Sequence, residues 1–223
     1  MIEVIIDMLP SALGVVISPL PIAAMILILM SDRAKSNGTA FVAGWILVVF
    51  AVGFTGLNLI GSNQDTTDHN KVALIVQLIA GILLLFLAGK NWVSRPKGTG
   101  EPKTPGWMSS LSKMRWFSAF GLAILLGGVN PKNLALILGG VGSIVEANLS
   151  ATDGYVALTI FVVIASLSLA VPLLYIIFAG QSAKKLLSKL KVWLVRYNSV
   201  VMAVVLLLVG LKLTIKAIVK LYA

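Results

Sequence analysis

Hydrophobic residues occupy six long runs of the chain, and shorter polar segments separate these runs. A helix that crosses a membrane needs about 20 predominantly apolar residues, and each run is long enough for one crossing. The first and fourth runs are long for a straight helix, and each contains proline near its middle. The pattern therefore predicts an all-α integral membrane protein with six transmembrane helices, of which helices 1 and 4 are broken. The expected spans are residues 4–30, 38–60, 71–93, 116–146, 153–180 and 197–220.

Composition points the same way, because 58% of the 223 residues are hydrophobic and only 12% are charged. Such values are typical of several membrane-crossing helices and not of a soluble domain. The chain has no cysteine, which excludes disulfides and thiolate metal sites. The sequence shows no catalytic triad, no paired carboxylates and no ligands at metal-binding spacing. We therefore expect no enzyme activity, no metal and no cofactor.

The formal net charge of +10 arises mostly in the loops between the apolar runs, where basic residues set membrane topology. Nucleic acid is therefore not an expected partner. The basic residues gather in the first, third and fifth loops, whereas the second loop has little basic charge and the fourth has none. Because cytoplasmic loops are the basic ones, both termini are expected on the outer side of the membrane.

Three runs, a basic loop and three more runs suggest an internal repeat. The first three-helix repeat is residues 1–93, a basic cytoplasmic linker is 94–115, and the second repeat is 116–223. Because each repeat has an odd number of spans, the second is expected to be inverted relative to the first. Near 183–196, leucines lie on one helical face and lysines on another, which predicts an amphipathic helix in the membrane interface. A solvated basic end of the sixth span is the alternative.

Aligning the two repeats places "SPLP" opposite "VNPKN", so that Ser18-Pro19 matches Asn130-Pro131. Each proline removes a backbone donor and breaks the helix, which frees backbone groups at mid-membrane depth. Such groups persist in hydrocarbon only when they are buried in protein or face a water-filled cavity. Two breaks at matching positions of inverted halves predict a transport site at the repeat interface, whereas two simple kinks are the alternative.

Lys132 directly follows the second break, and a charged side chain at that depth usually faces a cavity or a partner. Its alternative is to reach water along the surface of the helix. No carboxylate is expected near the middle of a span, so the lysine, freed amides and nearby polar side chains favour an anionic or highly hydroxylated substrate. Gln77 and Ser166 could add hydrogen bonds, although each alone is more often a packing contact between helices. The candidate substrate-binding residues are Ser18, Pro19, Pro21, Asn130, Pro131, Lys132, Asn133, Gln77 and Ser166.

The segments "SPLPIAAMILILMS" and "GGVNPKNLALIL", together with two three-span halves and a basic central loop, resemble the LysE superfamily. Within it, the chain is most similar to the GAP-like family of glycolipid- and sulfolipid-addressing proteins. The resemblance covers nearly the whole chain and is weakest in 94–115. It implies a bacterial inner-membrane protein that helps to move cell-envelope glycolipids outward. The acidic motifs of cation-exporting members and the cysteines of thiol-redox members are absent, so the resemblance does not extend to those activities.

The resulting expectation is an exporter of an amphipathic, anionic or glycosylated lipid for the cell envelope, surrounded by membrane lipids. Two alternatives stay open: an exporter of amino acids or other small solutes in the same fold, and a non-transporting membrane partner of a lipid-modifying enzyme. An intramembrane enzyme that uses Lys132 is a weaker third. A lipid-modifying enzyme and a second copy of the chain are the candidate protein partners.

Overall fold

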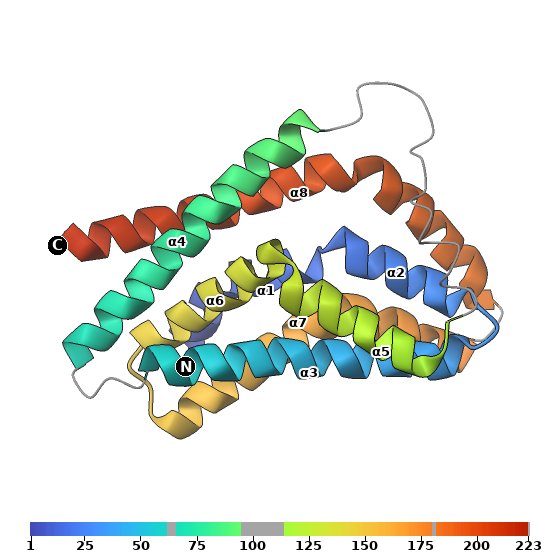
Figure 1. Cartoon of the computed structure of the whole chain (residues 1–223), viewed down its shortest axis with the longest axis horizontal. Helices are drawn as coiled ribbons and strands as arrows, with labels where there is room; N and C mark the ends of the chain where they lie inside the picture. The colour runs from blue at the N-terminus through green and yellow to red at the C-terminus, as the bar shows by residue number, and fades with distance from the viewer. Residues whose placement is uncertain (62–65, 95–113, 180–181, 223) are drawn as a thin grey trace.

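The computed structural model describes residues 1–61, 66–94, 114–179 and 182–222, and this part of the chain is helical apart from short connections, with no strand (Figure 1). Four of its helices are long and apolar enough to cross a membrane, or six spans result if each of two bent helix pairs is counted as one span. These helices fit a multi-pass membrane protein. The straight candidates are Ala34–Gly61, Lys71–Val93, Ala151–Phe178 and Ser199–Tyr222.

The predicted breaks in the first and fourth apolar runs are confirmed. Helix α1 (Ile2–Val16) and helix α2 (Pro19–Leu29) meet at an angle of 52°. The second bent pair meets at 64° and consists of α5 (Trp116–Ile124) with the π-helical turn η2 (Leu125–Val129) on one side and α6 (Pro131–Glu146) on the other. Both second halves begin at a proline, because proline fits the first turn of a helix but not its interior.

The helices form layers that can be followed in Figure 1. Helices α4 (Thr66–Val93) and α8 (Ser182–Tyr222) pack against each other along one edge. Their backbones approach closely where Gly81 faces Gly210, since a Cβ atom on Gly210 would lie 3.0 Å from the carbonyl oxygen of Gly81. Such small-residue contacts are typical of helix packing in membranes.

The opposite edge contains α3 (Ala34–Gly61), which packs against α5 and against α7 (Ala151–Ala179). Trp45 of α3 is fully buried there, and its Nε1 donates a hydrogen bond to the carbonyl of Ala165 at 3.3 Å. Helix α7 continues through Pro172 without a break. The two bent pairs lie between the edges, so both breaks are in the middle of the bundle (Figure 1).

Two sequence predictions fall largely outside the described residues. The linker 94–115 is described only at its two ends. The backbone of 183–196 is helical and belongs to α8 together with the predicted sixth span, but the side chains of these residues lie outside the described set. The interfacial amphipathic helix therefore stays a prediction.

Candidate substrate site at the two helix breaks

The two breaks have nearly the same local geometry. Ser18 precedes α2 with φ −71° and ψ 105°, and Asn130 precedes α6 with φ −72° and ψ 114°. Both residues occupy the N-cap position, and a proline follows each of them as the first helical residue. Serine and asparagine are favoured N-caps because their short polar side chains can accept hydrogen bonds from first-turn amides. Ser18-Pro19 and Asn130-Pro131 thus have similar backbone conformations.

The side chains of the two caps have different partners. Asn130 Oδ1 accepts a hydrogen bond from the backbone N–H of Lys132 at 3.1 Å, as an N-cap normally does. Ser18 makes no such cap bond. Pro21 at the third position of α2 has no N–H, but Leu20 at the second position, the equivalent of Lys132, keeps its own. The Ser18 hydroxyl does not bond it and instead reaches across to the other break.

The Ser18 hydroxyl joins the two bent pairs directly. Lys132 Nζ donates a hydrogen bond to Ser18 Oγ at 2.5 Å, and Ser18 Oγ donates in turn to Asn133 Oδ1 at 2.9 Å. The Lys132 ammonium also lies 3.5 Å from the Sδ atom of Met202, which comes from α8. Ser18 from the first break and Lys132 and Asn133 from the second therefore form one hydrogen-bonded group. Met202 of α8 contacts the ammonium of this group.

The π-helical turn explains the position of Asn133. In such a turn the carbonyl of Leu126 would accept from the residue five positions later, which is Pro131 and has no N–H. Asn133 Nδ2 donates to this carbonyl at 2.8 Å and so satisfies it. This bond also orients the Asn133 side chain so that its oxygen faces Ser18.

The break site carries a positive charge without a carboxylate partner. Among the described residues, the ion pairs do not include Lys132, and its polar contacts are neutral. The N-termini of α2 and α6 add positive helix-dipole character. Ser18 and Asn133 are 1% and 0% exposed, so the two breaks are in closed contact in this form. Chemically, the group can attract an anion and hydrogen-bond its oxygens, provided that the contact opens.

The other predicted site residues are placed as follows. Pro19 and Pro21 are buried at the start of α2, and Pro131 is exposed at the start of α6. Ser166 is not part of the group, since it donates to the Val162 carbonyl of its own helix at 2.7 Å. Gln77 is also elsewhere, because its Nε2 donates to Glu146 Oε2 at 3.1 Å near the far end of α6.

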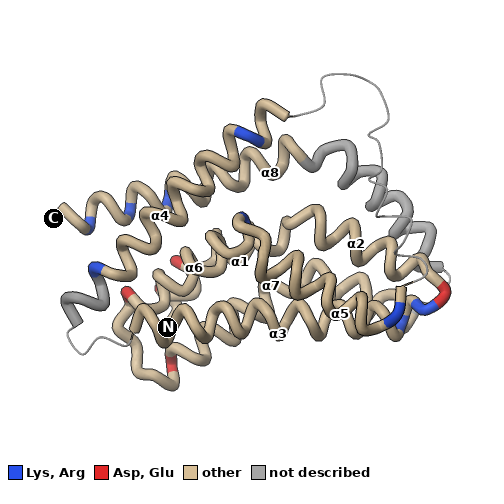
Figure 2. Tube along the Cα trace, viewed as in Figure 1, with Lys and Arg blue, Asp and Glu red and all other residues tan. Residues whose placement is uncertain are grey.

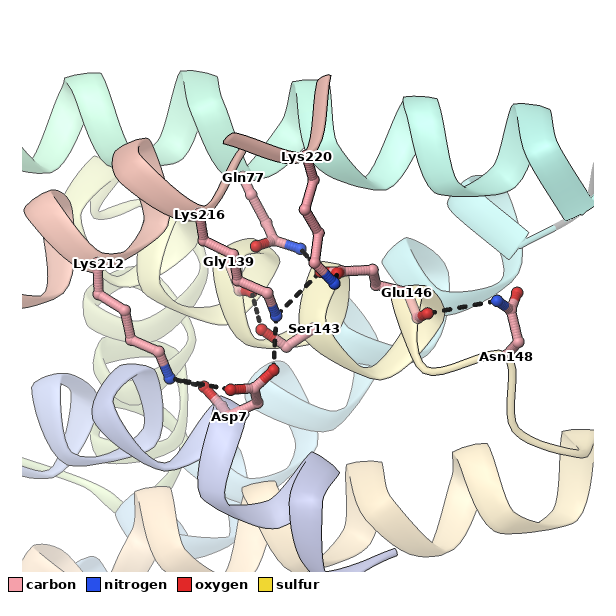
Figure 3. Close-up of polar contacts among 9 residues, drawn as sticks. All are labelled: Asp7, Gln77, Gly139, Ser143, Glu146, Asn148, Lys212, Lys216 and Lys220. Carbon is pink, nitrogen blue, oxygen red and sulfur yellow. Dashed lines mark hydrogen bonds and ion pairs between the residues drawn. The ribbon is translucent and has the colours of Figure 1, made fainter. Parts of the chain in front are cut away.

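Glu146, the partner of Gln77, belongs to an ion cluster that was not predicted from the sequence. The cluster consists of Asp7, Glu146, Lys212, Lys216 and Lys220 (Figure 3). Lys216 Nζ lies 2.6 Å from Asp7 Oδ2 and 3.0 Å from Glu146 Oε2, so it bridges α1 and α6. Lys212 pairs with Asp7 at 3.5 Å, and Lys220 pairs with the other oxygen of Glu146. The pair of Lys216 and Glu146 is the most buried one in the cluster, since their side chains are 16% and 6% exposed.

A signal for the ion cluster exists in the sequence. Lys212, Lys216 and Lys220 recur every four residues and thus share one face of α8. These three charges disagree with the predicted topology, because basic residues are typical of cytoplasmic segments and this end of the chain is predicted to be outside. Pairing with Asp7 and Glu146 explains how three lysines can be accommodated there. In the described part of the chain, no group of three His, Cys, Asp or Glu side chains could hold a metal ion.

A polar seam connects the ion cluster to the break site. Asp7, Ser11 and Gly14 lie on one face of α1, which leads to Ser18 at the break. On α6, one face carries Lys132, Leu136, Gly139, Ser143 and Glu146. The two faces meet, since a Cβ atom on Gly14 would lie 2.7 Å from Leu136 and one on Gly139 would lie 3.6 Å from Ser11 Oγ. Ser11 and Ser143 are buried along this α1–α6 seam.

Comparison with known proteins shows the family of the chain. No curated protein and no solved structure matches it. One family model, described as Sap, sulfolipid-1-addressing protein, matches residues 8–219. The matched range contains both helix breaks, the α1–α6 seam from Met8 onward and α8 as far as Val219. The chain therefore belongs to the sulfolipid-1-addressing protein family.

Proposed function

We propose that this protein exports an amphipathic lipid with an anionic or glycosylated head group across the cytoplasmic membrane of a bacterium. The observation that carries the proposal is the contact of Lys132 with Ser18 across two matched helix breaks. A lysine held there without a carboxylate partner suits a negatively charged group, such as a sulfate, a phosphate or a carboxylate. The family description, which names a sulfolipid, favours the same head-group chemistry.

In the proposed mechanism, the head group replaces Ser18 as the partner of Lys132. Because Ser18 and Asn133 are buried, binding requires α1–α2 and α5–α6 to separate at their breaks. The Asn130 amide N–H and the Ser18 hydroxyl then donate to the remaining oxygens of the head group, and Asn133 Oδ1 accepts from a head-group hydroxyl. The acyl chains stay in the apolar surroundings of the bundle, as hydrocarbon requires.

The α1–α6 seam is the proposed route from the break site to the outer side. Apart from Leu136 its named residues are small or polar, and the ion cluster closes it at the end where α6 finishes. The element order supports a repeat of LysE-superfamily type, since a bent pair followed by two long helices occurs twice. We propose that the second repeat is inverted relative to the first. Movement of one repeat against the other would then open the seam, while the cytoplasmic side of the break site closes. In this proposal both termini lie outside.

A flipping assay tests the proposal. The purified protein is reconstituted in liposomes that contain a fluorescent lipid with a sulfate or phosphate head group, and a membrane-impermeant reductant reports how much lipid becomes exposed outside. An imposed proton gradient and its absence are both measured. Lys132→Ala is expected to remove most of the protein-dependent movement. Lys71→Ala, which changes an exposed lysine of α4, is the matched control and is expected to behave like the unchanged protein.

The alternative functions give different results in the same liposomes. Export of free amino acids with no movement of any lipid would contradict the proposal and favour a small-solute exporter. If Lys132→Ala moves lipid as fast as the unchanged protein, the break site is not the substrate site. Absence of all movement, combined with copurification of a lipid-modifying enzyme whose activity depends on the chain, would favour a non-transporting partner.

A further inference from the structure

A groove of about 640 Å³ lies between α3 and α5, away from the break site. Lys35, Thr39 and Ala43 line it from α3, one turn apart on the same helical face. Trp116 and Phe120, also one turn apart, line it from α5. The groove therefore has a small-residue wall and an aromatic wall, with a lysine and hydroxyl groups at one end.

The shape of the groove follows from the packing of α3 on α5. At Gly44 the two helices touch, since a Cβ atom there would lie only 2.6 Å from the carbonyl oxygen of Phe120. Toward the beginning of both helices, Asn37 Nδ2 donates to the carbonyl of Met114 at 2.7 Å and holds the connection in place. Ala40 and Ala43 are too small to fill the space between these two contacts. The groove thus ends at Gly44.

The charge at this end of the molecule is mostly positive. Figure 2 shows basic segments gathered where α3 and α5 begin, with acidic charge beside them. The sequence there has Arg33, Lys35 and Arg115 against a single acid, Asp32. Among the described residues Lys35 makes no ion pair, so its ammonium is available at the groove. Basic pockets between transmembrane helices are suited to acidic lipid head groups.

We propose that this α3–α5 groove binds an anionic phospholipid of the surrounding bilayer. Its phosphate contacts Lys35 and the hydroxyls of Ser36 and Thr39, and one acyl chain lies along Ala40, Ala43 and the aromatic wall. The neighbouring side chains support a position at the lipid boundary, since Leu47 and Phe117 are 52% and 65% exposed. Trp116 is 47% exposed, as expected for a tryptophan at the level of the head groups. A free inorganic anion would use only the lysine end and leave the apolar part empty.

Quenching of Trp116 by lipids with brominated chains tests the site directly. The protein is reconstituted with brominated phosphatidylglycerol or brominated phosphatidylcholine, and the Trp116 signal is the difference between the unchanged protein and Trp116→Phe. We expect phosphatidylglycerol to be preferred at the groove by about fivefold, as one lysine near a membrane surface contributes. Lys35→Gln should abolish this preference. Ala43→Phe, which fills the groove at an exposed position, should reduce quenching by both lipids.

The control is Lys90→Gln, which removes one exposed basic residue of α4 and leaves the groove unchanged. It should retain the full preference for the anionic lipid. Equal quenching by both lipids in the unchanged protein, or a preference that survives Lys35→Gln, would overturn the proposal. The same measurement is made in buffer with inorganic phosphate and in buffer with chloride at the same ionic strength. If the preference for phosphatidylglycerol is lost only in phosphate, the groove is instead a site for a free anion. Because the assay measures no transport, its failure is distinguishable from failure of the proposed export function.

Discussion

The Ser18 hydroxyl accepts a hydrogen bond from Lys132 and donates one to Asn133. Only a group with both a donor and an acceptor can serve these two neighbours at once. In the interior of a membrane protein, an ammonium that loses its acceptor is costly, because no water replaces the lost partner. The serine therefore stabilises the closed contact of the two breaks, and its exchange for a substrate oxygen is what the proposed mechanism requires.

Ser18→Ala is expected to lower the free energy of unfolding by about 1–3 kcal/mol, because it removes both bonds and leaves the partly buried Lys132 ammonium with only Met202 Sδ, a weak acceptor. Unfolding in mixed micelles of mild detergent and dodecyl sulfate measures this change. Replacing both partners, as in Ser18→Ala with Lys132→Met, should recover much of the loss, since no buried charge is then left unpaired.

The matched control for this series is Ser166→Ala. This buried serine bonds only a carbonyl of its own helix, so its loss should cost less than that of Ser18. Equal effects of the two alanine variants, or strictly additive effects of Ser18→Ala and Lys132→Met, would show that the cross-break bond contributes no stability of its own.

At the scale of helices, close packing at glycine sets the positions of α3 and α5. The backbones touch at Gly44, and this contact fixes where the groove between the two helices ends. A methyl group at Gly44 would meet a backbone oxygen, which cannot rotate away as a flexible side chain can. The helices would have to separate, and such overpacking typically costs about 1–3 kcal/mol.

Gly44→Ala should therefore lower the apparent melting temperature of the detergent-purified protein. Gly89→Ala is the natural comparison, because a Cβ atom at Gly89 meets nothing within 4 Å. Alanine is a better helix former than glycine, so Gly89→Ala should be neutral or should stabilise the protein by up to about 1 kcal/mol. Melting temperatures that fall equally in both variants would contradict the packing role of Gly44.

The helix breaks could be predicted from the sequence because proline acts locally. Pro19 and Pro131 have no N–H wherever the chain places them, so a break follows from the residue itself. The bond between Ser18 and Lys132 also agrees with the predicted pairing of the breaks. The position of Gln77 could not be predicted, since it depends on how α4 packs against α6. The ion cluster was missed for the same reason, because its members come from three helices far apart in the sequence.

At the scale of the whole molecule, the ion cluster holds α1, α6 and α8 together at one end of the α1–α6 seam (Figure 3). Lys216 is the central residue, since it contacts a carboxylate from each of the other two helices. Removing the charge of Glu146 leaves Lys216 with Asp7 alone and frees Lys220. In the proposed transport cycle this change should favour the form that is open at this end, because one of the contacts that close it is lost.

Cysteine labelling can measure this opening, since the chain has no native cysteine. Ser11 lies on the seam between Asp7 and Ser18, and it is only 1% exposed. In the Ser11→Cys variant, a membrane-impermeant maleimide should react slowly. Adding Glu146→Gln should raise the rate by about tenfold, which corresponds to a shift of about 1.4 kcal/mol toward the open form. Reaction from the outer side would also agree with the predicted topology, in which both termini are outside.

Two comparisons separate opening of the seam from general loosening of the protein. Ser166→Cys places a buried cysteine on α7, away from the seam, and its labelling should not respond to Glu146→Gln. Asp153→Asn removes an exposed carboxylate near the same end of α6 but outside the ion cluster, and it should leave labelling at position 11 unchanged. If Glu146→Gln accelerates both cysteines alike, the ion cluster serves global stability. Faster labelling at position 11 alone means that the cluster controls access to the seam that leads to Lys132.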